Sequence, residues 1–287
     1  MIIDVHTHLF PDEVRKDRQS FCLRDEGFRL IYENKRARLA SLEDLLRAME
    51  RDGVERSVIC GFPWKDPGLC REGNDYLLHC SLRHPDRMIP FACLPLSSRR
   101  LAEREMERGL SRGMRGIGEL AFYRGGTSWR DIQRLSSILK PLANKRIPFL
   151  LHANEPVGHD YPGKSPEGLK PIYQLLLALS GVTIILAHWG GGFFFYELMP
   201  EVARVAQNVF YDTAASPFLY RPQIYSLAVK IVGPGRILFG SDYPLIPSAR
   251  YFAELEQSGL PGHIQAKIKG QNAKHLLLEK AGSGSGL

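Results

Sequence analysis

The chain has 287 residues, of which 44% are hydrophobic and 24% are charged, and this composition is typical of a soluble globular protein. No apolar run is long enough to cross a bilayer, and Asp4 and His6 stand where a secretory signal would need its apolar region, so we expect a cytoplasmic protein without a membrane partner. The formal net charge of +7 would attract anions, but Lys and Arg alternate with Glu in segments such as 99–112, which favours a solvated basic surface over a nucleic-acid site.

The first predicted element is an apolar strand at residues 2–9 that carries His6 and His8. Side chains two residues apart share one face of a strand, so both imidazoles should project together from its carboxyl end. Residues 10–40 show no clean hydrophobic period and are expected to form a long loop. A serine-capped amphipathic helix is expected at 41–53, where glycine ends it.

Strand-like and helix-like segments then alternate to the end of the chain. The further strands are expected at residues 56–62, 88–95, 115–122, 147–154, 182–188, 209–213 and 236–241. The further helices are expected at residues 72–83, 101–112, 131–145 (kinked at Pro141), 167–179, 200–207, 222–232, 251–258 and 263–279. Eight apolar strands, each followed by a helix, predict a single (β/α)8 TIM barrel over residues 1–280, with a loop insertion after the first strand, a C-terminal helix and a flexible tail at 281–287. An open doubly wound sheet is the alternative, but no Gly-x-Gly-x-x-Gly turn follows the first strand.

Polar residues stand at the carboxyl ends of four later strands: Glu119, His152, His188 and Asp242. The carboxyl ends of barrel strands converge on one face, so these side chains should meet His6 and His8 there. A single histidine at a strand end is more often structural, and it is the convergence of four histidines with two carboxylates that predicts a metal site.

Four motifs resemble the strand-end motifs of the amidohydrolase superfamily: Asp4-Val5-His6-Thr7-His8, Leu151-His152, Leu186-Ala187-His188-Trp189-Gly190-Gly191 and Phe239-Gly240-Ser241-Asp242-Tyr243-Pro244. In this order they span nearly the whole chain, and they are most similar to the branch that contains amidohydrolase-2 type hydrolases and decarboxylases. The ligands that this resemblance implies for a divalent metal are His6, His8, His152 and Asp242. It also implies that His188 binds a second metal or orients the attacking water.

Glu119 leaves the number of metal ions open. Many binuclear members of the superfamily bridge two ions with a carboxylated lysine on the fourth strand, and this chain has no lysine there. Glu119 resembles the glutamate of TatD-like deoxyribonucleases, which would allow a second ion through Glu119 and His188, although Leu-Ala-Phe follows it here instead of Gly-Leu-Asp. The alternative is a structural carboxylate held by Arg115 or Arg124.

This ligand set predicts a metal-dependent hydrolase of a small amide, lactone or ester. Zinc is the expected ion, with manganese, iron, cobalt or nickel as alternatives, and it would lower the pKa of bound water from about 15.7 to about 7. Asp242 would accept the water's proton and pass it to the leaving group, while His188 polarises the carbonyl or holds the water. Two other functions share these residues: a decarboxylase of an aromatic or enoic acid, in which Asp242 or His188 delivers a proton to carbon, and a TatD-like deoxyribonuclease.

The loop at 155–164 directly follows His152 and is expected to overhang the metal. The candidate substrate-binding residues are Glu155, His159, Tyr161 and Trp189. A rigid structural lid is the alternative for the loop, and a place in the core is the alternative for Trp189. We expect a small-molecule substrate, and self-association into a homo-oligomer stays open.

Overall fold

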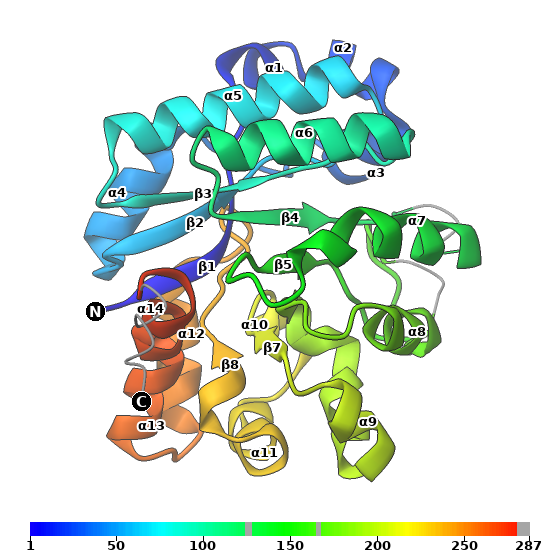
Figure 1. Cartoon of the computed structure of the whole chain (residues 1–287). Coiled ribbons are helices and arrows are strands. Elements are labelled where there is room, and N and C mark those ends of the chain that lie inside the picture. Colours follow the sequence, from blue (N-terminus) through cyan, green and yellow to red (C-terminus); the bar gives the residue numbers. More distant parts are fainter. Residues whose placement is uncertain (124–127, 165–167, 280–287) are drawn as a thin grey trace, which may run out of the picture.

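The computed structural model describes residues 1–123, 128–164 and 168–279, and its centre is a ring of eight parallel strands (Figure 1). In chain order the strands are β1 (Ile3–His8), β2 (Arg56–Cys60), β3 (Met88–Ala92), β4 (Gly116–Leu120), β5 (Phe149–Leu151), β6 (Ile184–Leu186), β7 (Val209–Asp212) and β8 (Ile237–Leu238). Each strand pairs with the next one along the chain. The chain after β8 pairs with β1. The contacts are a bridge between Thr7 and Tyr243 and a 2.9 Å hydrogen bond from the Val5 N–H to the Phe239 carbonyl. The predicted (β/α)8 barrel is confirmed.

Helices surround this ring (Figure 1). They are α1 (Asp12–Lys16), α2 (Arg18–Arg24), α3 (Glu26–Tyr32), α4 (Leu42–Asp52), α5 (Pro67–Arg83), α6 (Arg99–Ser111), α7 (Trp129–Leu139), α8 (Lys170–Ala178), α9 (Pro200–Val205), α10 (Ser216–Leu219), α11 (Gln223–Val232), α12 (Ser248–Gln257), α13 (Gly262–Ala266) and α14 (Asn272–Leu277). Irregular helical segments are η1 (Lys140–Leu142), η2 (His188–Leu198), η3 (Pro234–Arg236) and η4 (Lys267–Gln271). α5 and α6 lie side by side against β3, and α14 lies beside the start of β1.

Helix α4 shows how local sequence determines an element of the barrel. The Ser41 hydroxyl accepts a 3.1 Å hydrogen bond from the Asp44 N–H, and the Asp44 carboxylate accepts a 3.0 Å bond from the Ser41 N–H. Gly53, with φ of 70°, ends the helix in the left-handed conformation. Leu45 and Met49, four residues apart, share the buried face. The predicted capped helix is confirmed.

The segment between β1 and α4 corrects the prediction of a loop, because it forms the three short helices α1, α2 and α3. Asp17 and Asp25 cap α2 and α3. Phe28 of α3 is fully buried, and its ring stacks on Trp64 with 4.7 Å between centroids and meets Phe62 edge-on at 5.3 Å. These partners lie after β2, far along the chain, so the packing that orders the segment leaves no helical period in its own sequence.

Two helix predictions also need correction. α7 ends at Leu139 and η1 contains Pro141, so this proline ends the helix where a kink was expected. The C-terminal helix is divided into α13, η4 and α14. A Cβ on Gly270 of η4 would lie 2.4 Å from the Met1 carbonyl oxygen, so only glycine allows η4 to approach the start of the chain this closely. The tail at 281–287 lies outside the described residues, and its flexibility stays a prediction.

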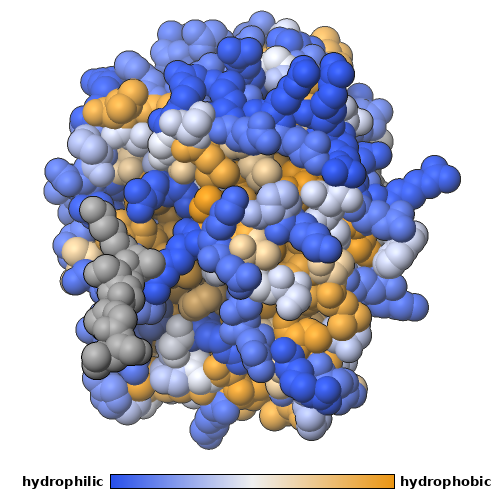
Figure 2. All heavy atoms as spheres, in the orientation of Figure 1, coloured by the Kyte–Doolittle hydropathy of each residue, from blue (hydrophilic) through white to orange (hydrophobic). Residues whose placement is uncertain are grey.

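The surface over α5 and α6 is mainly hydrophilic, with apolar patches elsewhere on the same face (Figure 2). On α6 basic and acidic side chains pair along the helix, with Arg99 2.7 Å from Glu103 and Arg108 2.6 Å from Glu105. Such pairing fits the solvated basic surface expected from the sequence. Within the described parts of the chain, no helix is both long enough and apolar enough to span a membrane.

Candidate metal centre

The carboxyl ends of five strands bring the predicted donor side chains together. The donors are His6 and His8 of β1, Glu119 of β4, His152 after β5, His188 after β6 and Asp242 after β8. The imidazole rings are close neighbours: the centroids of His6 and His8 lie 5.1 Å apart, those of His6 and His188 5.4 Å, and those of His152 and His188 4.9 Å. The convergence expected from barrel topology is therefore present in the structure.

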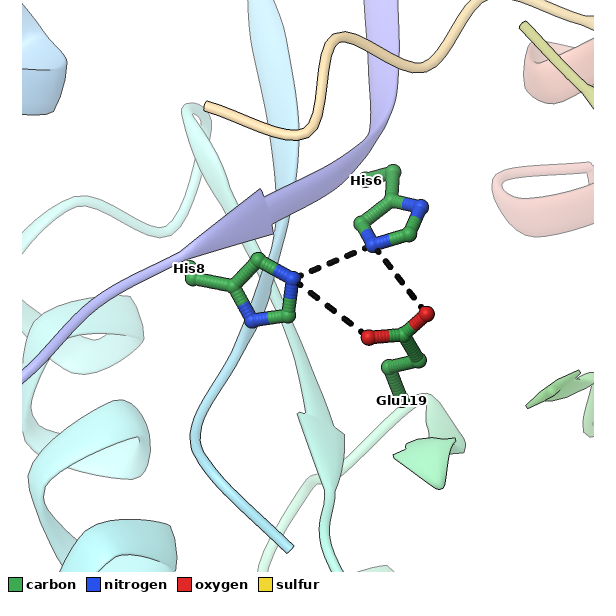
Figure 3. Close-up of side chains that lie close together, drawn as sticks. All are labelled: His6, His8 and Glu119. Carbon is green, nitrogen blue, oxygen red and sulfur yellow. Dashed lines mark hydrogen bonds and ion pairs between the residues drawn. The ribbon is translucent and has the colours of Figure 1, made fainter. Parts of the chain in front are cut away.

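Four of these side chains surround one small space, and three of them are shown in Figure 3. Nε2 of His6 lies 3.1 Å from Nε2 of His8. Glu119 places Oε1 3.6 Å from the His6 nitrogen and Oε2 3.6 Å from the His8 nitrogen. On the other side, Oδ1 of Asp242 lies 3.3 Å from Nε2 of His8 and 3.7 Å from Nε2 of His6. The Asp242 N–H also donates to the His6 carbonyl at 2.9 Å, which ties the turn after β8 to β1.

Hydrogen bonds behind the rings determine which nitrogen of each histidine faces this space. Nδ1 of His8 lies 3.3 Å from the Gly61 carbonyl oxygen, and Nδ1 of His188 lies 3.1 Å from the Ala214 carbonyl oxygen. A carbonyl oxygen only accepts, so in both rings Nδ1 carries the hydrogen. The Nε2 lone pair of each neutral ring is therefore directed to the centre.

In His6, too, Nδ1 carries the hydrogen, because it lies 2.9 Å from Oδ2 of Asp212, a carboxylate oxygen that accepts the hydrogen bond. Its Nε2 lone pair then faces that of His8, with the carboxylates of Glu119 and Asp242 close by, and this arrangement is repulsive unless a cation or a proton lies between them. Two nitrogens bound to one ion at about 2.0–2.1 Å would be about 2.9 Å apart at a right angle and about 3.3 Å apart at the tetrahedral angle, which brackets the observed 3.1 Å. The donor set fits a divalent metal ion.

Glu119 also belongs to a second group of donors, with His152 and His188. Nδ1 of His152 lies 3.1 Å and Nε2 of His188 lies 3.8 Å from Oε1 of Glu119. Nε2 of His152 is buried and has no hydrogen-bond partner among the described residues. A buried ring nitrogen without a partner is costly, so this atom is a place where a bound group would be stabilised.

The arginine alternative for Glu119 is wrong for Arg115, whose guanidinium donates to the Leu277 carbonyl at 3.2 Å. Arg124 lies outside the described residues. Among the described residues, the ion pairs of Glu119 are all with histidines: His6, His8, His152 and His188. Glu119 therefore belongs to the centre and does not serve as an anchor for Arg115.

Charges within the centre shift its pKa values in opposite directions. Burial alone would raise the pKa of Glu119, but the neighbouring histidines, His6 first, outweigh it and lower that pKa well below the usual range. Burial would lower the pKa of His6, but Glu119 and Asp212 raise it well above the usual value. Burial would raise the pKa of Asp242, but the neighbouring histidines, His8 first, outweigh it and lower that pKa. A metal ion binding here must therefore compete with a proton on His6.

A pocket of about 540 Å³ connects this centre to the surface. Its floor is formed by the donors His8, Glu119, His152, His188 and Asp242. Part of its wall comes from α3 and the residues after it: Ile31, Tyr32, Asn34, Arg36, Ala37 and Arg38. A volume of this size suits a small molecule.

The predicted substrate-binding residues divide into two groups. His159 and Tyr161 line the pocket. Glu155 does not line it, and its carboxylate instead accepts a 3.1 Å hydrogen bond from the Tyr161 hydroxyl, which supports the wall from behind. The prediction that Trp189 walls the pocket is wrong, because Trp189 is fully buried and its indole N–H donates to the Ser216 hydroxyl at 3.0 Å, within the core.

The sequence interpretation missed two kinds of residue. Asp212 ends β7 as a polar residue after an apolar run, which is the same signal that identified Glu119 and His188. Arg36 and Arg38 line the pocket but carried no signal, because they follow a segment without a readable period.

A ring of eight parallel strands whose carboxyl ends carry four histidines and two carboxylates defines a (β/α)8 protein with a candidate metal centre. The chain belongs to the amidohydrolase family, whose family model, described as "Amidohydrolase", matches residues 3–278.

Among curated proteins, the gamma-resorcylate decarboxylase of Rhizobium radiobacter is 26% identical over 258 residues, which cover 72% of this chain and 78% of that protein. Among solved structures, a dihydroxybenzoic acid decarboxylase from Polaromonas with bound manganese and 2-nitroresorcinol has a TM-score of 0.69, 20% identity and 96% coverage of both chains. A 5-carboxyvanillate decarboxylase from Novosphingobium aromaticivorans, with bound manganese and 3-methoxy-4-hydroxy-5-nitrobenzoic acid, has a TM-score of 0.74, 15% identity and 96% coverage of both chains.

These comparisons overturn the expectation of a hydrolase. The matched curated relatives are gamma-resorcylate decarboxylases, which remove a carboxylate and add no water to their substrate. The alternative that the sequence offered, a carbon–carbon lyase with the same donor residues, agrees with them. The chain is thus an enzyme of the amidohydrolase superfamily whose relatives are decarboxylases.

Proposed function

We propose that this protein is a metal-dependent decarboxylase of a small aromatic acid. The observation that carries the proposal is a cluster of inward-facing nitrogen lone pairs and carboxylates on the floor of a pocket, in a chain whose relatives are decarboxylases. Enoic acids are the second substrate class, and the aromatic side chains Phe62, Tyr123 and Tyr161 of the pocket favour the aromatic one.

In this proposal one divalent ion is held by His6, His8, Glu119 and Asp242. Manganese is proposed beside the zinc expected from the sequence, because imidazole and carboxylate ligands suit both ions and two of the relatives contain manganese. The inward lone pairs and the fitting nitrogen separation support this ion. The predicted ligand role of His152 and a second ion between Glu119 and His188 stay predictions.

Decarboxylation breaks the bond between a ring carbon and the carboxylate carbon, releases carbon dioxide and leaves an electron pair on the ring carbon, where a proton must be added. A bound divalent ion would hold the carboxylate and an adjacent oxygen of the substrate and offset their charge. We assign the proton delivery to Asp242, whose partly exposed carboxylate reaches the pocket floor. Because its pKa is lowered, Asp242 must first collect a proton from solvent or a substrate hydroxyl. His188, whose Nε2 faces the same space, is the alternative donor.

The pocket rim suits an anionic substrate. Arg36 and Arg38 line the pocket, and no ion pair with a carboxylate is formed by either among the residues described. Two unpaired guanidinium groups at a pocket mouth raise the local concentration of an acid. Below them, the rings of Phe62 and Tyr123 are nearly parallel, at 17°, and offer a flat apolar wall.

The test is product analysis in D₂O. The protein, loaded with Mn²⁺ or Zn²⁺, is incubated with 2,6-dihydroxybenzoate, 5-carboxyvanillate and further hydroxybenzoates, with benzoate as the control without a hydroxyl group. We expect carbon dioxide together with an equal amount of a product that carries deuterium at the vacated carbon. Absence of carbon dioxide from every acid in the panel, with the metal bound, would reject the proposal.

A further inference from the structure

Asp212, at the end of β7, uses both carboxylate oxygens on residues of the candidate metal centre. Oδ2 accepts from Nδ1 of His6 at 2.9 Å. Oδ1 accepts from the backbone N–H of His188 at 2.9 Å and of Ala214 at 3.0 Å. The side chain is fully buried, and within the part of the chain that the structure describes its ion pair is with His6 and with no Lys or Arg.

We propose that Asp212 is a positioning residue that prepares His6 and His188 for the metal before the metal binds. The proposal rests on the metal-dependent function proposed above, because it concerns the residues that would face that ion. It assigns to Asp212 two tasks, one on the ring of His6 and one on the backbone of His188.

The first task concerns the proton on His6. A neutral imidazole carries its hydrogen on either Nδ1 or Nε2, and only the Nδ1–H form leaves a lone pair at Nε2 for a metal. An ionised carboxylate only accepts hydrogen bonds, so Asp212 stabilises the Nδ1–H form. Without it, a hydrogen on Nε2 would point at Nε2 of His8, 3.1 Å away, and occupy the place of the metal.

The second task concerns the backbone at His188. This residue has φ of 55°, a left-handed conformation that a non-glycine residue keeps only when its surroundings impose it. The bond from the His188 N–H to Asp212 supports this conformation. The same carboxylate oxygen accepts from Ala214, whose carbonyl in turn accepts from Nδ1 of His188, so one closed set of bonds fixes both the backbone and the ring.

Asp4 offers a matched control, because it is a second buried carboxylate that links strands beside the same site. It accepts from the Ser241 N–H at 3.0 Å, from the Ser241 hydroxyl at 2.5 Å and from the His6 N–H at 3.1 Å. Within the described part of the chain, its hydrogen bonds come from two backbone N–H groups and one hydroxyl, and from no imidazole ring. Loss of the Asp4 carboxylate should therefore weaken packing between β1 and the turn after β8 without moving the His6 proton.

The test compares Asp212→Asn and Asp4→Asn. The asparagine amide is nearly isosteric with the carboxylate, but in either orientation its NH₂ group faces a donor: the His6 Nδ1–H or the two backbone N–H groups. Nitrogen-15 NMR of labelled histidines in the metal-free protein, at alkaline pH where the rings are neutral, reports which nitrogen of His6 carries the hydrogen. Zn²⁺ affinity is measured by competition with a chelator.

We expect Nδ1–H at His6 in the wild type and in Asp4→Asn, and a population of Nε2–H in Asp212→Asn together with a Zn²⁺ affinity about 10–100-fold weaker. A wild-type His6 that carries its hydrogen on Nε2 would overturn the proposal, and this spectrum decides even if the variant does not fold. An Asp212→Asn protein with the wild-type tautomer and wild-type Zn²⁺ affinity would overturn it as well. These two measurements involve no turnover, so their outcome does not depend on whether the protein is a decarboxylase.

Discussion

The floor and the rim of the pocket are built in different ways. The floor consists of strand-end residues such as His8 and Glu119, which are 8% and 3% exposed and are held by further hydrogen bonds. His6, which is 0% exposed, contacts both of them and completes the metal centre without lining the pocket. The rim consists of exposed residues such as Arg36 and His159, which come from the long connections after β1 and β5. The barrel therefore supplies the candidate metal ligands in a frame of paired strands, whereas we propose that the connections supply the surface that selects the substrate.

The largest expected effect is at the floor. His6→Ala or His8→Ala removes an inward nitrogen, so we expect metal content below about a tenth of an equivalent per chain and no measurable carbon dioxide release. Because these side chains lie at the functional end of β1, the barrel should still fold, as judged by circular dichroism. Full metal content in either variant, or collapse of the fold in both, would contradict the assigned role.

The next effect concerns proton transfer. Asp242→Asn keeps the shape of the side chain but cannot carry a proton, so kcat should fall by roughly 10²–10⁴ once a substrate is known. Metal content must be measured in the same preparation, because Asp242 also faces His8. Near-native turnover in a fully metallated Asp242→Asn enzyme would leave His188 as the proton donor.

The Glu119→Gln variant distinguishes a centre with one metal ion from a centre with two, because a neutral amide is a far poorer ligand than a carboxylate. If Glu119 is shared between the two donor groups, the variant should lose about one equivalent of a two-ion load. Elemental analysis of the metal content per chain, in the variant and in the wild type, distinguishes the two cases. If the single ion proposed here is bound, the variant should hold that ion more weakly, and an unchanged load of one equivalent would contradict the assignment of Glu119 as one of its ligands.

The floor should also respond to pH. The raised pKa of His6 means that its protonation stabilises the metal-free fold; this contribution is fully present below the unfolded value of 6.5 and is lost as pH rises through the folded pKa. A metal ion replaces that proton, so the affinity for Zn²⁺ should fall by up to about tenfold per pH unit as pH decreases through this range. The measurement is the gain in Tm that Zn²⁺ causes, determined by thermal unfolding with and without the metal at a series of pH values. An equal gain in Tm from the metal at pH values below and above the His6 pKa would contradict the competition.

The smallest effects are expected at the rim. Arg36→Ala combined with Arg38→Ala should raise KM several-fold, with kcat nearly unchanged, because the two charges attract the acid without touching the reacting bond. The matched control is Arg99→Ala, an exposed arginine paired with Glu103 on α6 and absent from the pocket lining. A loss in kcat equal to the loss in kcat/KM would contradict the recognition role and indicate that these arginines act in the chemical step.

The same comparison explains what the sequence could predict. Floor residues such as His152 and Asp242 were readable because each is a polar residue after a buried apolar strand, and parallel strands place their ends on one face. Asp212 carried that signal as well and was overlooked. Arg36 and the helices around Phe28 were not readable, since their order depends on packing against residues after β2.

The reaction was misjudged for a related physical reason. A metal ion held by these donors would activate water in a hydrolase and would hold the substrate's carboxylate in a decarboxylase, so the donor residues alone do not distinguish the two reactions. We propose that the walls and rim of the pocket distinguish the two substrates; they include Tyr123 and Arg38, which no sequence period reveals.

We expect the strand-end centre, with a metal ion bound, to release carbon dioxide from its substrate. The most direct measurement adds Mn²⁺ or Zn²⁺ stepwise to the metal-free protein and follows carbon dioxide release from a hydroxybenzoate at each step. We expect release that rises with added metal, stops rising at one equivalent per chain and is absent from His6→Ala. Release that is independent of metal, or hydrolysis of esters or lactones by the metal-loaded protein with no carbon dioxide from any acid, would contradict it.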